Sequence, residues 1–347
     1  MNTKVVTIEE VTEERLREAG AILQAGGLVA FPTETVYGLG GDALNPDSSR
    51  KIYAAKGRPS DNPLIVHIAN MEDLEPIVTE VTEEARKVAE AFWPGPLTMI
   101  LPKSDRIPFE TTGGLNTVAV RMPSHEVARK LIEYGGGYVA APSANTSGKP
   151  SPTVAKYVIE DMNGKIDMII DGGEVGIGLE STIIDLTVSP PQILRPGYIT
   201  ENMLAEVLGS VDTDKTILSN DSGQAPKAPG MKYRHYAPKG ELIIVDGDPK
   251  QVVKYINEQT GACQAKGCKV GIIGCTESLN AYEADVVKNI GSREDEEAIA
   301  KNLYRILREF DEEEVDMIYS ESFETIGMGQ AIMNRLLKAA GHKVIHL

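Results

Sequence analysis

Four segments of the chain concentrate glycine, proline, hydroxyl and cationic residues, the types that bind anions and shape ligand loops. They span residues 32–41, 56–63, 141–152 and 171–182. An ordinary turn needs only one or two such residues, and each of these segments has many more. Open α/β sheets bind ligands outside the ends of their strands. The sequence therefore predicts one pocket at which these four loops could meet.

Two cations in the second segment could bind a polyphosphate. Lys56 offers a point charge, and Arg58 can bind two oxygens at once. The alternative is a solvated helix end whose cations face the negative end of the helix dipole. Neither cation is expected in the core, so replacing either should leave the fold intact. In the third segment, Ser143 and Asn145 could bind a phosphate, a metal-bound water or a carboxylate, or could form a turn that satisfies its own backbone.

A second group of polar residues lies in or beside apolar strands. His67 interrupts an apolar run and could be a ligand-binding residue or a satisfied core histidine. Arg121 ends another apolar run, where it could bind a carboxylate or reach solvent by snorkelling. Glu34 and Glu180 could assist proton transfer, but loop carboxylates are more often capping groups. We assign these two glutamates no role from the sequence.

The familiar nucleotide-binding loops do not match. Ser143 stands where a phosphate-binding P-loop needs its first glycine, and Pro150 replaces that motif's Ser or Thr. Residues 176–181 lack the third glycine of the dinucleotide fingerprint. A nucleotide would therefore bind here in a different geometry.

Apolar runs and helical patterns are interspersed along the first two hundred residues, which indicates one α/β domain around a mixed, twisted sheet. A first helix is expected between its cap at Thr12 and the stop at Gly26. Strands are expected at residues 28–31, 64–68, 97–101, 117–121, 138–141, 168–170, 182–186 and 192–194, and further helices at 48–55, 83–92, 126–134 and 201–208.

The chain changes character after residue 208. Residues 209–239 show no periodicity, which is typical of a linker or a long functional loop. Strand and helix patterns then alternate again to the end, as in a smaller, doubly wound α/β domain. We predict domains at 1–208 and 240–347, joined by a linker at 209–239.

Composition narrows the class of protein. The formal net charge is −16, of which −7 falls after residue 240, so neither part has the positive excess of a protein that grips nucleic acid. The three cysteines have neither zinc nor disulfide spacing, and we expect no metal ligands from the chain. The N-terminus is polar and no apolar run approaches a membrane span. We therefore expect a cytoplasmic protein without strong direct binding to nucleic acid or membranes.

Taken together, the four segments resemble the YrdC-type domain of the two-domain threonylcarbamoyl-AMP synthases. The motifs, in the order and spacing of that family, are FPTETVYGLG at 31–40, KGRPSDNPL at 56–64, PSANTSGKPSPT at 142–153, EST at 180–182 and LRPG at 194–197. Residues 229–238 (PGMKYRHYAP) resemble the family's linker, and 329–340 resemble the end of its C-terminal domain. The resemblance covers roughly residues 10–347. It implies a YrdC-like domain followed by a smaller Rossmann-like domain.

The resemblance also implies roles for individual residues. Lys56, Arg58, Ser143 and Asn145 match the polar tetrad around the phosphates. Further ATP-binding positions match Asn62, Thr117, Ser151, Arg195 and Tyr236. The threonine-binding positions match Thr35, His67, Arg121, Ala141 and Ser181. Mg²⁺ is expected to accompany ATP, without assigned protein ligands.

The implied reaction joins L-threonine, bicarbonate (or CO₂) and ATP into threonylcarbamoyl-AMP and pyrophosphate, for N6-threonylcarbamoyladenosine in tRNA. Its carbamate and mixed anhydride are unstable and anionic, so catalysis should rest on positioning, charge stabilisation and exclusion of water. The aromatic and cationic residues 232–236 suggest that the linker acts as a lid. The implied partners downstream are the enzymes that transfer the threonylcarbamoyl group to tRNA.

Two other classes of protein are alternatives to this interpretation. YrdC-type domains have been regarded as RNA-binding modules, which the acidic charge disfavours. Carbamoyl-transfer enzymes of hydrogenase maturation contain a related domain, but they also carry cysteine-rich zinc fingers that this sequence lacks.

Overall fold

The computed structural model describes residues 2–214, 217 and 236–347. The described residues form two compact units. The first contains residues 2–147, 151–214 and 217, and the second contains residues 148–150 and 236–347. Each unit is described by itself below.

The first unit is built on one mixed sheet in the spatial order β1-β8-β2-β3-β7-β4-β6-β5-β9-β10-β11. Its strands are β1 (Lys4–Val6), β2 (Val29–Phe31), β3 (Gly38–Asp42), β4 (Ile65–His67), β5 (Leu97–Pro102), β6 (Thr117–Arg121), β7 (Val139–Ala140), β8 (Met168–Ile170), β9 (Thr182–Asp185), β10 (Gln192–Arg195) and β11 (Asp212–Thr213). Parallel and antiparallel pairs alternate irregularly, so the predicted mixed α/β class is confirmed.

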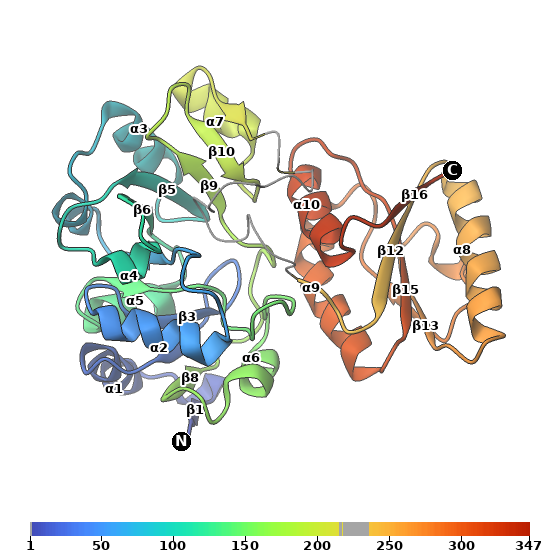
Figure 1. The fold of residues 1–347 in the computed structure, drawn as a ribbon, viewed down its shortest axis with the longest axis horizontal. Coiled ribbons are helices and arrows are strands. Elements are labelled where there is room, and N and C mark those ends of the chain that lie inside the picture. The colour runs from blue at the N-terminus through green and yellow to red at the C-terminus, as the bar shows by residue number, and fades with distance from the viewer. Residues whose placement is uncertain (1, 215–216, 218–235) are drawn as a thin grey trace. The chain divides into compact units, whose positions relative to one another are not determined.

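Helices cover this sheet and pack in pairs. They are α1 (Glu13–Gln24), α2 (Pro46–Lys56), α3 (Glu83–Phe92), α4 (Phe109–Thr112), α5 (Glu126–Tyr134), α6 (Ala155–Met162) and α7 (Glu201–Leu208), with 3₁₀ turns η1 (Ile8–Glu10), η2 (Met71–Asp73) and η3 (Glu75–Ile77). Helices α1 and α5 lie side by side, as do α3 and α7 (Figure 1). Thr12 caps α1 and Thr82 caps α3 by accepting a backbone N–H, as hydroxyl caps commonly do.

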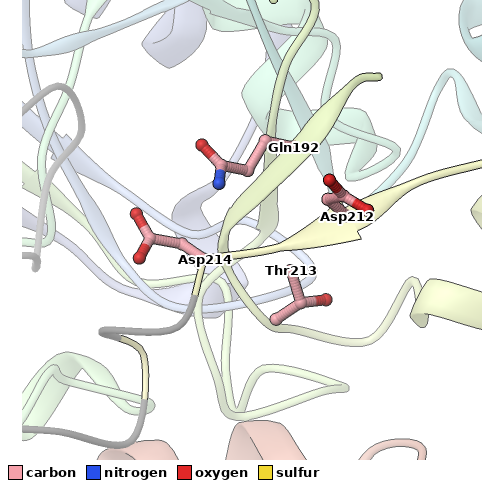
Figure 2. A pocket seen from close by; sticks show the side chains of 4 residues that line it. All are labelled: Gln192, Asp212, Thr213 and Asp214. Atoms are coloured by element: carbon pink, nitrogen blue, oxygen red, sulfur yellow. The ribbon is translucent and has the colours of Figure 1, made fainter. Parts of the chain in front are cut away.

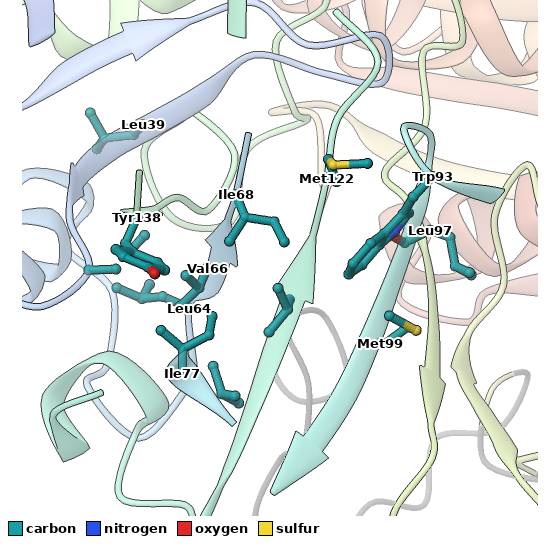
Figure 3. Close-up of a cluster of buried hydrophobic side chains, with 14 of the residues drawn as sticks. Leu39, Leu64, Val66, Ile68, Ile77, Trp93, Leu97, Met99, Met122 and Tyr138 are labelled. Atoms are coloured by element: carbon teal, nitrogen blue, oxygen red, sulfur yellow. The ribbon is translucent and has the colours of Figure 1, made fainter. Parts of the chain in front are cut away.

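The central strands of the first unit are buried on both faces. Leu64, Val66 and Ile68 point into the largest apolar cluster, where Trp93 and Tyr138 also pack (Figure 3). The alternate residue, Ile65, belongs to a separate cluster. The two-residue period of a strand explains this division, and burial on both faces explains why the strand reads as a continuous apolar run. The site residues at the ends of β4 and β6 are thus held on a rigid base.

The second unit is an all-parallel sheet in the order β14-β13-β15-β12-β16. Helix α8 lies on one face, with α9 and α10 on the other (Figure 1). This is the doubly wound arrangement that the alternating pattern predicts. The elements are β12 (Glu241–Asp246), α8 (Pro249–Gln264), β13 (Val270–Gly274), η5 (Leu279–Ala281), β14 (Val286–Asn289), α9 (Glu296–Glu312), β15 (Met317–Glu321), α10 (Gly329–Ala339) and β16 (Val344–His346).

In the described part of the chain, no helix has both the length and the apolar character needed to cross a membrane. Most of the predicted linker, 215–216 and 218–235, lies outside the described residues, and so does most of the proposed lid. Strand β11 falls within the range predicted as linker and pairs in parallel with β10, so sheet structure continues past residue 208.

Candidate active site

Lys56 is the last residue of helix α2, which positions it in the candidate site. Asn45 caps the start of the helix, and Gly57 ends it in the left-handed conformation that glycine adopts without strain. Lys56 is only 2% exposed, and its Nζ donates to the carbonyl oxygens of Ser143 (2.5 Å) and Asn145 (2.6 Å). The alternative of a solvated helix end is therefore wrong for Lys56. So is the expectation that this cation lies outside the packed interior.

The loop after β7 is fixed by its neighbours as well as by Lys56. Ser143 forms an isolated bridge with Gly38, and the Ala144 N–H donates to the Tyr37 carbonyl. The Ser143 hydroxyl in turn donates to the side-chain oxygen of Asn145 at 2.5 Å. The backbone of residues 142–145 is thus bonded to the segments 32–41 and 56–63, and not to itself as the alternative of a self-satisfied turn requires.

The first and fourth segments are also joined. The backbone N–H groups of Ile177 and Gly178 donate to the carbonyls of Glu34 and Thr35. Tyr37 Oη donates to the Gly173 carbonyl at 2.7 Å. Backbone and side-chain bonds therefore connect segments 32–41, 56–63, 141–152 and 171–182, as their shared composition predicts.

Three residues of the implied ATP group lie where two parallel strands begin. Arg58 Nη2 donates to the carbonyls of Asn62 (3.2 Å) and Pro63 (3.0 Å), which shapes the approach to β4. Thr117 opens β6, and the register that pairs Ile65 with Ala119 brings this end of β6 beside the start of β4. Arg58, Asn62 and Thr117 therefore share one edge of the sheet.

Two further residues of that group lie beside the EST motif. Ser151 Oγ donates to Glu180 Oε1 at 2.5 Å, and both side chains are buried. Arg195 donates from Nε to the Ser181 carbonyl (2.9 Å) and from Nη2 to Ser181 Oγ (3.0 Å). The Glu180 side chain thus connects the fourth segment to Ser151 of the third segment through this hydrogen bond.

Two of the residues implied for threonine lie at the opposite ends of β4 and β6. His67 and Arg121 are direct neighbours in the parallel register. Arg121 is four residues beyond Thr117 on β6, a distance of about 13 Å at the usual rise per residue. The Ala141 N–H donates to the Ile65 carbonyl, which places the start of the third loop beside the same strand. Thr35 is fully buried, with its hydroxyl 2.9 Å from that of Thr33.

Arg121 does not snorkel to solvent. It is 4% exposed, and its guanidinium lies against the carboxylate of Glu34. Burial, with a smaller contribution from the charge of Arg121, lowers the pKa of His67 to about 3. His67 is therefore neutral at physiological pH, with Nδ1 3.1 Å from the Ile65 carbonyl oxygen. It is both a buried strand residue and a neutral polar group beside the arginine.

The lowered pKa of His67 should make stability depend on pH. Between about pH 6.5 and the folded value of about 3, only the unfolded chain binds this proton, so stability falls as the pH falls. Unfolding by denaturant at pH 7, 6 and 5 should show a steeper loss for the wild type than for His67→Gln. The difference should approach about 1.4 kcal/mol per pH unit. Parallel profiles would show that folding does not lower the pKa of His67.

One buried polar residue escaped the sequence analysis. Thr98, on β5, is fully buried and pairs with Arg121 across the antiparallel register. Its hydroxyl lies 2.8 Å from that of Ser181, so it links the EST loop to the strand that carries Arg121. The available signal was a hydroxyl residue inside an otherwise apolar run, 97–101.

Tyr236 belongs to the second unit, where its ring packs on that of Tyr304 with centroids 5.1 Å apart. Its backbone has a positive φ of 63°, which a non-glycine residue seldom adopts. The four residues that precede it, 232–235, lie outside the described residues.

A hollow of about 530 Å³ lies elsewhere in the first unit, at strands β10 and β11 (Figure 2). Its lining residues are Gln192, Asp212, Thr213 and Asp214. Two carboxylates would repel a nucleotide, and none of these residues belongs to the four segments. This hollow is therefore a poor candidate for the phosphate site.

Comparisons with known proteins cover nearly the whole chain. A family model described as "Telomere recombination" matches residues 21–197, and one described as "Threonylcarbamoyl-AMP synthase, C-terminal domain" matches residues 199–341. The chain is 50% identical to the threonylcarbamoyl-AMP synthase of Pyrococcus abyssi over 99% of both chains. It is 48% identical to that of Bacillus subtilis, over 98% of this chain and 97% of the relative.

A solved structure extends this likeness to the fold. The crystal structure of Pyrococcus abyssi Sua5 complexed with L-threonine matches with a TM-score of 0.94 and 49% identity, over 99% of this chain and all of that chain. The order of the motifs, the joined loops and these full-length relatives agree. The chain therefore belongs to the threonylcarbamoyl-AMP synthase family, in its two-domain form.

Proposed function

We propose that this protein joins L-threonine, bicarbonate and ATP into threonylcarbamoyl-AMP, with release of pyrophosphate. The observation that carries the proposal is that four loops, each with a motif of this family, are bonded to one another around Lys56, Arg121 and His67. The relative solved with bound L-threonine, 49% identical over 99% of this chain, supports threonine as the amino acid.

The chemistry needs no covalent intermediate with the protein. The threonine amine combines with bicarbonate to give a carbamate and water. A carbamate oxygen then attacks the α-phosphorus of ATP, and pyrophosphate leaves. Because each species is anionic, cations and hydrogen-bond donors that are already in place can stabilise the charge that develops.

Part of the division follows β4 and β6. Near the starts of these strands we assign Arg58, Asn62 and Thr117 to ATP. We assign Ser151, Arg195 and Tyr236 to ATP from the motifs that they match. Lys56, Ser143 and Asn145 are assigned to the phosphates, where the lysine both holds the loop and would supply positive charge. At the ends of the strands we assign Arg121 to the threonine carboxylate and His67 to the rest of the amino acid. Thr35, Ala141 and Ser181 are assigned to the same amino acid from the motifs that they match.

We also propose that ATP binds as its Mg²⁺ complex. Among the described residues, no group of three or more His, Cys, Asp or Glu side chains could hold a metal ion. Mg²⁺ commonly relies on phosphate oxygens and water with few protein carboxylates, so ions carried by the nucleotide suit these residues. The ion would neutralise phosphate charge, while Lys56 and Arg58 act on the same region from the protein side.

The product is a reactive mixed anhydride, so it must pass to a second enzyme before water hydrolyses it. We propose that this enzyme is part of the machinery that forms N6-threonylcarbamoyladenosine in tRNA. The negative charge of the chain argues that the intermediate is handed on without strong binding of the tRNA by this protein itself.

The proposed reaction predicts a strict dependence on all substrates. Pyrophosphate release from ATP should occur only when threonine, bicarbonate and Mg²⁺ are present together, because no attacking carbamate forms without the first two. Release of phosphate, which a general ATPase would give, should remain at background. Equal turnover with threonine omitted would refute the assignment.

A further inference from the structure

Glu34 brings a carboxylate to the residue that we assign to the threonine carboxylate. It lies next to Thr35 in the first loop, and its Oε1 is 2.7 Å from Arg121 Nη2. The two side chains are 14% and 5% exposed. The sequence separates them by 87 positions, and the fold places them together inside the site.

The ion pair leaves much of its hydrogen-bonding capacity unused. In the described part of the chain, both carboxylate oxygens of Glu34 are buried without a hydrogen-bond partner. The same holds for Nε and Nη2 of Arg121, although Nη2 lies 2.7 Å from Glu34 Oε1. A buried ion pair that serves only stability normally satisfies these atoms, since burying them unpaired is costly.

The unpaired polar atoms of Glu34 and Arg121 are complementary to the two charges of a zwitterion. Arg121 offers donors to a carboxylate, and Glu34 offers acceptors to an ammonium group. His67, the neighbour of Arg121, is neutral and adds no charge. His125 also faces Glu34: burial lowers its pKa, while the charges of Glu34 and Glu126 oppose that shift. An α-amino acid inserted at the pair would place each of its charges opposite a partner.

We propose that Glu34 binds the α-ammonium group of the substrate and so makes this subsite select a zwitterionic amino acid over a simple carboxylic acid. The inference rests on the proposed function, in which Arg121 binds the threonine carboxylate. A carboxylic acid without an amine would compete with Glu34 for Arg121 and leave the Glu34 carboxylate without compensation. Threonine avoids this cost because it carries its own cation.

Wild-type protein alone gives a first test, which needs no variant. Calorimetric titrations with L-threonine and with 3-hydroxybutanoate, which lacks the α-amine, should show at least about 10²-fold weaker binding of the second ligand, because a hydrogen-bonded charge is lost and another is left unpaired. Equal affinities would overturn the inference. Absence of any threonine binding would instead count against the proposed function.

The second test is Glu34→Gln, which keeps the size of the side chain and removes its charge. Threonine should bind about 10- to 10²-fold more weakly, and 3-hydroxybutanoate should bind more tightly than to the wild type. The matched control is Glu126→Gln, which removes an exposed carboxylate that pairs with Lys130. That variant should keep the wild-type preference.

The pattern of changes separates binding of the ammonium from other roles. If Glu34→Gln weakened both ligands alike, Glu34 would only hold the loop in place. If it tightened threonine binding, Glu34 would only compete for Arg121. Either result would overturn the inference, whereas a collapse of the ratio between the two ligands, with threonine weakened, would support it.

Discussion

Replacing Arg58 with alanine should lower kcat/KM for pyrophosphate release by about 10²–10³, the usual loss when one preorganised charge-stabilising donor is removed. Arg58 lies just beyond the glycine that ends α2, and the residue as a whole is only partly buried. Its removal takes away positive charge and two contacts to the carbonyls of Asn62 and Pro63. Initial rates at varied ATP, with threonine and bicarbonate saturating, would measure the effect.

Helix α2 supplies the control for this experiment. Arg50→Ala removes an exposed arginine that pairs with Asp47 and Glu110, and it should leave the kinetics unchanged. Lys56→Ala is less clean, because Lys56 is buried and holds the Ser143 loop, so activity and folding should both decline. Near-full activity of Arg58→Ala with saturable ATP would contradict the phosphate-site assignment.

Replacing Arg121 with alanine should raise the KM for threonine by an order of 10²–10³ and change the KM for ATP much less. The reason is that this substitution removes the cation that we assign to the threonine carboxylate. It also leaves the buried Glu34 carboxylate without its ion-pair partner. His67→Ala should shift the same parameter in the same direction, since the two residues are neighbours on β4 and β6. A change confined to ATP would exchange our assignment of the two subsites.

The Arg121→Ala variant should also have a lower free energy of unfolding than the wild type. With Arg121 gone, Glu34 keeps a buried carboxylate without its cation, at a cost on the order of 3–5 kcal/mol. Adding Glu34→Gln to Arg121→Ala should recover part of that loss without restoring threonine use. Additive losses from the two changes would mean that the residues are not coupled.

Apolar runs in the sequence predict most strands of the sheet. The runs at 64–68, 97–101 and 117–121 became β4, β5 and β6, because strands buried on both faces need continuous apolar residues. Strand β3 (Gly38–Asp42) was not predicted, since its glycines indicate a loop. In the structure a Cβ at Gly40 would lie 2.9 Å from side-chain atoms of both Phe31 and Val139, so close packing explains this glycine.

The site was predictable as a set of segments but not as a set of contacts. Composition marked the four loops, and family motifs assigned their residues. No local pattern, however, indicates that Lys56 holds the carbonyls of residues 143 and 145, or that Glu34 meets Arg121. These contacts depend on which strands neighbour each other, and β4, β6 and β7 pair across long separations in sequence.

The central claim is that a threonine carbamate is adenylated. Its most direct test is to incubate the protein with ATP, Mg²⁺, L-threonine and isotopically labelled bicarbonate, and to identify the adenylates by mass spectrometry. The expected product is an adenylate that contains threonine and one labelled carbonyl, formed with L-threonine and absent when threonine or the enzyme is omitted. An adenylate of threonine without the labelled carbon, or ATP hydrolysis without any such adenylate, would contradict this claim.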